Sequence, residues 1–167
     1  SPFTRDLAAL PNVTFEKWDG RKNLSLFCDF FIVGGAGILD VSFASGKPII
    51  NAHGGIIPLT RGLDSFKWAI YNNDPIGNTL HLIDEQVDKG QILAIRNTPI
   101  FESDNIEILA RRHYEMEISL LSNVLKYIDN RVTPTENEKA ATMRMNVETE
   151  RIMIKNFEKW KALMLKN

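Results

Sequence analysis

Two short apolar runs, each followed at once by a glycine pair, constrain the fold of this chain more than any other feature. Residues 30–33 are apolar and precede the glycines at 34–35, and residues 48–53 repeat this form before the glycines at 54–55. Runs of this length, bounded by turn residues, are typical of strands that are buried on both faces of a parallel sheet. We therefore expect both runs to be central strands of an α/β domain with a mainly parallel sheet.

Later segments predict the elements that surround these strands. Residues 78–83 and 91–96 resemble the two strands of a hairpin, separated by a polar loop. The helical patterns are residues 67–72 with capping side chains Asp64 and Ser65, a long helix from a capping box of Asp104 and Glu107 to near Asn130, and a final helix through Trp160. We expect these helices to cover both faces of the sheet.

Composition fits one ordinary globular domain that spans residues 1–167. The chain is 44% hydrophobic and 25% charged, and its formal net charge is -1. A balanced charge gives no global attraction to nucleic acid or to an anionic membrane, and no apolar run is long enough to span a bilayer. The single cysteine, Cys28, allows no internal disulfide, which suits a reducing compartment. We therefore expect a cytoplasmic domain without a membrane or nucleic-acid partner.

Asn51 and His53 are the first candidates for chemistry. They are two residues apart on a predicted strand, so their side chains share one face at its carboxyl end. Open parallel sheets bind ligands at that edge. An amide donor beside an imidazole suits a reaction in which a carbonyl oxygen gains negative charge. The spacing also fits a capped strand end with a surface histidine.

His81 and the acidic loop 84–88 allow three interpretations. An imidazole and three carboxylates in a short span are conceivable metal ligands, but the spacing matches no known metal motif. The loop also fits the solvated tip of a hairpin. In the third interpretation, one carboxylate turns back to orient His53 and to take up a proton from a nucleophile.

The glycines near residue 35 do not form a nucleotide-binding motif. Asp40 stands where the dinucleotide fingerprint requires its third glycine, and Pro48 after Lys47 excludes a phosphate loop. The glycines fit either a flat ligand that approaches the backbone closely or a plain tight turn. Arg61, just after the Asn51 strand, is placed where it could meet an anionic group of an acceptor. The segment 111–113 is predicted to be a solvated helix face.

Several motifs together resemble the folate-dependent formyltransferase family. They are residues 51–62, 68–70, 77–81 and 84–93, in this order and at this spacing. The resemblance is strongest over residues 30–95, and it includes the Asn-x-His pair of the family and a later Asp-x-Gly. It implies a Rossmann-like α/β fold and transfer of a formyl group from 10-formyltetrahydrofolate to a primary amine, without a metal.

The resemblance also implies roles for individual residues. Asn51 would bind the formyl oxygen, His53 would stabilise or protonate the developing oxyanion, and Asp88 would orient His53 and assist proton removal from the amine. The pterin would lie against the segment 35–39 and the acidic loop. The residues assigned to the formyl donor are Gly35, Ala36, Gly37, Leu39, Asp84 and Glu85, and those assigned to the acceptor are Arg61 and His81.

Departures from the family pattern guide the choice of acceptor. The glycines at 54–55 replace the Pro-Ser or Gly-Ser that commonly follows the histidine, and the first strand-helix unit of the family is not found before Ser1. We therefore expect a truncated domain whose exposed sheet edge favours a homodimer. A nucleotide-linked amino sugar, as used in polysaccharide biosynthesis, is the first expectation for the acceptor. Glycinamide ribonucleotide, methionyl-tRNA and a non-catalytic folate-binding module are the alternatives.

Overall fold

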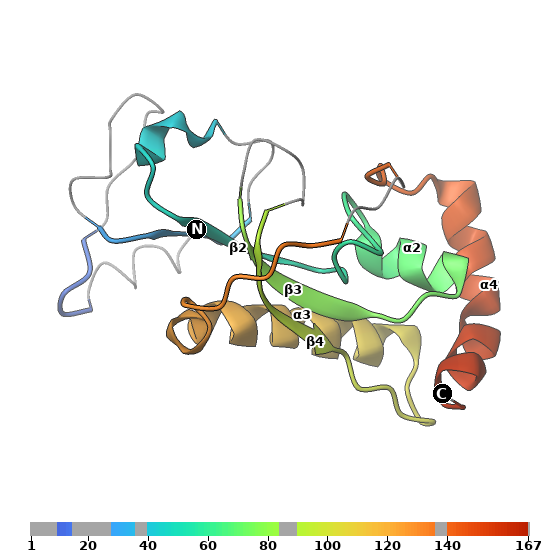
Figure 1. Ribbon diagram of the computed structural model, residues 1–167. Helices are drawn as coiled ribbons and strands as arrows, with labels where there is room; N and C mark the ends of the chain where they lie inside the picture. The colour runs from blue at the N-terminus through green and yellow to red at the C-terminus, as the bar shows by residue number, and fades with distance from the viewer. Residues whose placement is uncertain (1–9, 15–27, 36–39, 84–89, 136–139, 167) are drawn as a thin grey trace.

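The computed structural model describes residues 10–14, 28–35, 40–83, 90–135 and 140–166 (Figure 1). Their elements, in chain order, are β1 (Phe31–Val33), η2 (Val41–Ala44), β2 (Ile49–His53), α2 (Ser65–Asn72), β3 (Gly77–Leu82), β4 (Ile92–Asn97), α3 (Ile106–Ser122), η3 (Val124–Lys126) and α4 (Val147–Met164). The four strands form one sheet in the order β1-β2-β3-β4.

The sheet confirms that the predicted segments form strands, and it confirms the α/β class. The predicted burial on both faces is wrong for β1, which stands first in the described strand order and in which Ile32 is 48% exposed. The two glycine-terminated runs form β1 and β2, which pair in parallel, and β3 and β4 form the predicted antiparallel hairpin. The difference lies between β2 and β3, which pair antiparallel. The described sheet is therefore mixed, with parallel pairing only between β1 and β2.

The path of the chain after β2 explains this antiparallel pairing. His53 at the end of β2 lies opposite Thr79 near the start of β3, so the connection leaves and re-enters the sheet at the same end. A parallel partner would require a crossover that runs back along the sheet. Instead α2 packs mainly against α4, beside the sheet, and α3 is the helix that packs on β2 and β3 (Figure 1). Among the described residues, the helices thus do not divide between the two faces.

The strands β2 and β3 present an apolar face to α3 and a polar face to the other side. Ile50 and Ala52 of β2 and Leu80 of β3 pack with Leu120 of α3 in one buried cluster. Because side chains alternate along a strand, Asn51, His53, Thr79 and His81 lie on the opposite face. This alternation places the predicted site residues together on one surface of the sheet.

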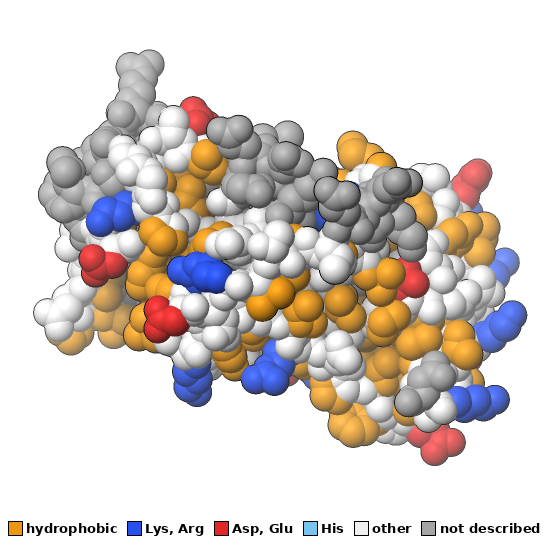
Figure 2. Space-filling view, in the orientation of Figure 1, with side chains coloured by type: hydrophobic (Ala, Val, Ile, Leu, Met, Phe, Trp, Pro, Cys, Tyr) orange, Lys and Arg blue, Asp and Glu red, His pale blue; other side chains and the backbone are white. Residues whose placement is uncertain are grey.

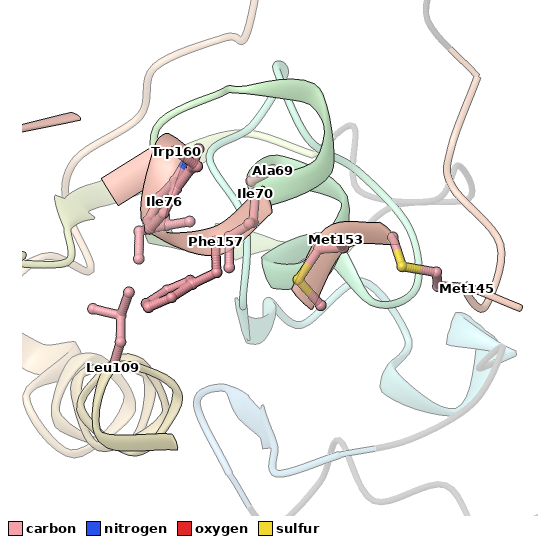
Figure 3. Packing of buried hydrophobic residues seen from close by; sticks show 8 residues of the cluster. All are labelled: Ala69, Ile70, Ile76, Leu109, Met145, Met153, Phe157 and Trp160. Carbon is pink, nitrogen blue, oxygen red and sulfur yellow. The ribbon is translucent and has the colours of Figure 1, made fainter. Parts of the chain in front are cut away.

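A second core joins the three helices. Trp160 and Phe157 of α4 pack with residues of α2 and with Leu109 of α3, and Trp160 is fully buried (Figure 3). The indole nitrogen of Trp160 donates to the Asp74 carbonyl at 3.0 Å, so this buried polar group has a partner. The final helix is therefore part of the core of the domain.

Two predicted helix ends are corrected by the structure. Asn105, not Asp104, caps α3 and accepts from the Ile108 amide at 2.9 Å. The Asp104 carboxylate is bound by the Arg112 guanidinium through contacts of 2.6 and 2.7 Å, and these hydrogen bonds lower the pKa of Asp104. This bidentate pair allows the Asp104 carboxylate to be buried, because an unpaired buried carboxylate would cost stability. The long helix ends at Ser122, and η3 continues the chain.

The visible surface mixes hydrophobic and charged side chains. In Figure 2 hydrophobic side chains extend across the middle of this face, and lysine and arginine side chains project mainly along its lower and right edges. No helix in the described part of the chain combines the length and the apolar composition needed to cross a membrane.

The segment around Thr142 is hydrogen-bonded to the loop between β2 and α2. The Thr142 amide donates to the Arg61 carbonyl at 2.8 Å, and the Leu63 amide donates to the Thr142 carbonyl at 2.8 Å. The one proton of the Thr142 hydroxyl is within reach of two carbonyl oxygens, that of Arg61 at 2.8 Å and that of Leu63 at 2.7 Å. Gly62 lies beneath this segment with a φ of +93°, and a Cβ there would lie 2.3 Å from the Thr142 carbonyl oxygen.

We predict that Gly62→Ala lowers the free energy of unfolding by about 2 to 4 kcal/mol, because the new methyl group meets backbone at a strained φ. Urea denaturation measures this change. The matched control is Gly34→Ala, since a Cβ at Gly34 meets no atom within 4 Å among the residues that the structure describes. Equal unfolding free energies for the two variants would contradict the prediction.

A buried histidine links α3 to the loop that follows β2. The Nε2–H of His113 donates to the Gly54 carbonyl at 3.2 Å, and the Thr98 hydroxyl donates to Nδ1 at 2.7 Å. Asn78 adds a bond of 3.0 Å to the His113 carbonyl. Both ring nitrogens are thus satisfied in the neutral form, and burial lowers the pKa of His113 to about 4. The segment expected to be a solvated helix face is therefore partly buried.

This pKa predicts a loss of stability in mild acid. The unfolded chain takes up a proton on His113 near pH 6.5, whereas the folded chain takes it up only near pH 4. Between these values the unfolded state binds more protons, so the free energy of unfolding falls as the pH falls, by up to about 3 kcal/mol from this group. Urea denaturation across this range measures the loss.

The control variant is His113→Gln, which keeps an N–H donor and does not titrate. Burial raises the pKa of Glu117, which opposes the effect in mild acid, but both proteins retain Glu117 and its contribution cancels in the difference. Parallel pH dependences in the two proteins would rule out His113 as the source.

Candidate active site

Asn51 and His53 share one face of β2, as their spacing predicts. The antiparallel register places Asn51 opposite His81 and His53 opposite Thr79. His53 is 8% exposed, His81 is 2% exposed and Thr79 is fully buried. The site thus lies where water has limited access, which strengthens its electrostatic interactions.

His81 is a hydrogen-bond partner of Asn51. The Nδ2 atom of Asn51 lies 3.4 Å from His81 Nε2, and His81 Nδ1 lies 2.9 Å from the Leu82 carbonyl oxygen. A carbonyl only accepts, so Nδ1 carries a proton toward Leu82 and Nε2 accepts from Asn51 when the ring is neutral. This arrangement directs one of the two Nδ2–H groups of Asn51 toward His81. The role in acceptor binding that the sequence suggests for His81 stays a prediction.

His53 is held by the loop that follows it and by the start of α2. Its Nε2 atom lies 3.0 Å from the Thr60 carbonyl oxygen and 3.1 Å from the Ser65 hydroxyl. The imidazole rings of His53 and His81 meet edge to face, with centroids 6.4 Å apart. The sequence predicts Ser65 only as a helix-capping side chain, and it gives no signal for either contact with His53, because both contacts require the loop to fold back on β2.

Gly55 has no room for a side chain. A Cβ there would lie 2.6 Å from the Thr60 carbonyl oxygen and 2.7 Å from His53 Nε2. The loop is closed by the Thr60 hydroxyl, which accepts from the Ile56 amide at 3.0 Å, and by the Thr79 hydroxyl, which donates to the Gly55 carbonyl at 2.7 Å. The second glycine after the histidine is thus explained by close packing around His53.

Two side chains of α3 reach this loop from the other side of the sheet. Measured from a Cβ placed on Gly54, His113 Nε2 lies at 3.3 Å and a Glu117 carboxylate oxygen at 3.5 Å. The only sequence signal for the pair is their spacing of four residues, which places them on one helix face. Sequence reasoning therefore missed both contacts with Gly54.

Arg61 is buried beside the site, with 8% exposure, and its backbone is bound by Thr142. A contact between its side chain and an acceptor stays a prediction. Gly35 follows β1 with a φ of +92°, and a Cβ there would meet no atom of the described residues within 4 Å. The close approach of a flat ligand at Gly35 stays a prediction.

The remaining predicted site residues lie outside the described residues. They are Ala36, Gly37, Leu39, Asp84, Glu85 and Asp88. Within the described ranges, no group of three or more histidine, cysteine or acidic side chains is placed to hold a metal ion.

The described arrangement combines an oriented amide donor with a buried imidazole. Both groups sit on rigid strand backbone, and their hydrogen-bond partners are fixed by the β2–β3 register and by the loop. Such preorganised donors can stabilise an oxygen that gains negative charge.

Comparisons with known proteins identify the family of this chain. The family model for formyl transferases matches residues 39–125, just over half of the chain. A methionyl-tRNA formyltransferase of Ehrlichia canis is 34% identical over 126 residues, which cover 73% of this chain and 42% of the relative. A phosphoribosylglycinamide formyltransferase of Haemophilus influenzae is 34% identical over 108 residues, covering 62% of this chain and 50% of the relative. The chain therefore spans half or less of these two relatives.

Solved structures show the same fold. The formyltransferase PseJ from Anoxybacillus kamchatkensis, in complex with a UDP-linked formamido sugar and tetrahydrofolate, matches with a TM-score of 0.58 at 21% identity and covers 87% of this chain and 79% of that one. A phosphoribosylglycinamide formyltransferase from Bacillus halodurans matches with a TM-score of 0.51 at 30% identity, over 61% of this chain and 57% of that one. With the family-model match over more than half of its length and the mixed α/β sheet that carries Asn51 and His53, this chain belongs to the formyl transferase family.

Proposed function

We propose that this domain transfers a formyl group from 10-formyltetrahydrofolate to a primary amine of a nucleotide-linked amino sugar. The observation that carries the proposal is the placement of the Asn51 amide and the His53 imidazole side by side on one face of β2. Family membership supplies the reaction class and the folate donor. The single cysteine suits the cytoplasm, where we place this reaction.

The donor set of the site fits the formyl group. Formyl transfer is complete when the amine nitrogen has replaced N10 on the formyl carbon, the amine has lost one proton and N10 has gained one. The bound folate supplies the activated formyl group. Asn51 Nδ2–H is placed to donate to the formyl oxygen, and His53 is placed to stabilise or protonate that oxygen as it gains charge. We assign to Asp88 the orientation of His53 and the uptake of the amine proton.

Two observations favour a small acceptor over a tRNA. The formal net charge is -1, so no global positive field attracts a polynucleotide. The fold match that covers 87% of this chain is to a protein whose crystal structure holds a UDP-linked sugar. Glycinamide ribonucleotide is the second candidate, because a relative of that activity is 34% identical over 108 residues.

A comparison of acceptors tests the proposal. We expect the chain, supplied with 10-formyltetrahydrofolate, to formylate a UDP-linked 4-amino sugar, with glycinamide ribonucleotide and initiator methionyl-tRNA assayed in parallel. Formylation of glycinamide ribonucleotide alone would select the second candidate. Folate-analogue binding without turnover on any acceptor would indicate a binding module, and a folded chain that neither binds nor turns over would contradict the proposal.

We predict that Asn51→Ala lowers kcat by about 100-fold or more, because the variant loses a donor to the developing oxyanion. Folate-analogue binding, measured by calorimetry, should persist. The matched control is Asn97→Ala, since Asn97 is an exposed asparagine at the end of β4 and distant in sequence from the site. Similar kcat values for both variants would remove Asn51 from the reaction.

A further inference from the structure

We infer that Ser65, together with the Thr60 carbonyl, holds His53 with its proton on Nε2, and that Ser65 is thereby a positioning residue for formyl transfer. The inference rests on the proposed function for the reaction that His53 serves. The arrangement of hydrogen bonds that carries it is independent of that function. Three groups carry the inference: the Thr60 carbonyl, the Ser65 hydroxyl and the second ring nitrogen of His53.

His53 Nε2 lies 3.0 Å from the Thr60 carbonyl oxygen. A carbonyl oxygen has lone pairs and no proton to give. If Nε2 also carried only a lone pair, two acceptors would face each other in a buried position, at the cost of an unmade hydrogen bond. The Thr60 carbonyl therefore requires a proton on Nε2.

The Ser65 hydroxyl oxygen lies 3.1 Å from the same Nε2 atom. A serine hydroxyl has one proton, and that of Ser65 is directed to the Gly62 carbonyl oxygen at 2.9 Å. The lone pairs of Ser65 Oγ then face Nε2–H and accept from it. Thr60 and Ser65 thus impose the same protonation state on His53, and each donor in the group has an acceptor.

The packing around these atoms leaves them little freedom. Ser65 is 5% exposed at the first position of α2, and the peptide that contains the Gly62 carbonyl lies beneath the Thr142 segment. On the other side of the ring, Gly55 has no room for a Cβ next to His53 Nε2. The two acceptors therefore stay aligned with Nε2–H.

The consequence concerns Nδ1. Because the Nε2 proton is held by two protein acceptors, the proton that His53 exchanges with the reacting groups is carried by Nδ1. A neutral His53 in the Nε2–H form accepts at Nδ1, and the imidazolium donates from Nδ1. Thr60 and Ser65 together thus determine which ring nitrogen of His53 takes part in the reaction.

Nitrogen NMR of the imidazole rings tests the protonation state directly. The chain has three histidines, so His53 is assigned by comparison with a His53→Asn variant. We expect the neutral wild-type ring to show a protonated Nε2 and an unprotonated Nδ1. A wild-type ring with its proton on Nδ1 would overturn the inference, whatever the activity of the chain.

The effect of Ser65 is tested with substitutions. In Ser65→Ala we expect a measurable fraction of the Nδ1–H form and a kcat that is lower by about tenfold, with the KM for folate within about twofold, because one acceptor of Nε2–H is lost. Ser65→Thr keeps the hydroxyl and should restore both readouts. The matched control is Ser122→Ala, since the exposed Ser122 hydroxyl also donates to a backbone carbonyl, at 2.8 Å, but on the surface of α3.

The readouts separate this inference from the proposed function. An Nε2–H ring in a chain that formylates no amine would contradict the proposed function and leave the protonation state established. An active chain in which Ser65→Ala changes neither the NMR signature nor kcat would overturn the role of Ser65. If Ser65→Ala does not fold, the wild-type spectrum and the Ser65→Thr variant still decide between these outcomes.

Discussion

The antiparallel pairing of β2 with β3 is the constraint on which the rest of the site depends. It places Asn51 opposite His81 and His53 opposite Thr79, so that four polar side chains meet on one face. The other face of the same strands packs on α3 through Ile50, Ala52 and Leu80. A shift of one residue in this register would turn the polar groups into the core, so burial of the apolar face fixes the position of the site.

The loop between β2 and α2 then determines what the imidazole of His53 can do. Thr142 binds the backbone of this loop, and His113 binds its Gly54 carbonyl. The Thr60 and Thr79 hydroxyls add hydrogen bonds to the loop backbone. Its glycines allow approaches that any side chain would block. A loop that is bound from several sides can hold an imidazole within the narrow range of positions that catalysis requires.

The proposed chemistry relies on two hydrogen-bond donors, the Asn51 amide and, once protonated, Nδ1 of the His53 imidazole. Such donors can stabilise an oxygen that becomes negative during the reaction. This is consistent with membership of the formyl transferase family, whose relatives act on several acceptors.

Local sequence patterns were enough to predict the strands, the α/β class, the family and the shared face of Asn51 and His53. An apolar run stopped by glycines predicts a strand, and a spacing of two residues fixes a common face. The burial predicted for both runs holds for β2 and not for β1, because burial depends on the neighbouring segments. Sequence reasoning failed where a partner distant in the chain decides the outcome. It expected mainly parallel pairing, a cap at Asp104 and a solvated face around His113. Only the tertiary structure assigned Asp104 to Arg112, His113 to Gly54, and Thr60 and Ser65 to His53, because a hydrogen bond between distant segments depends on how the chain folds back and leaves no periodic signal in the sequence.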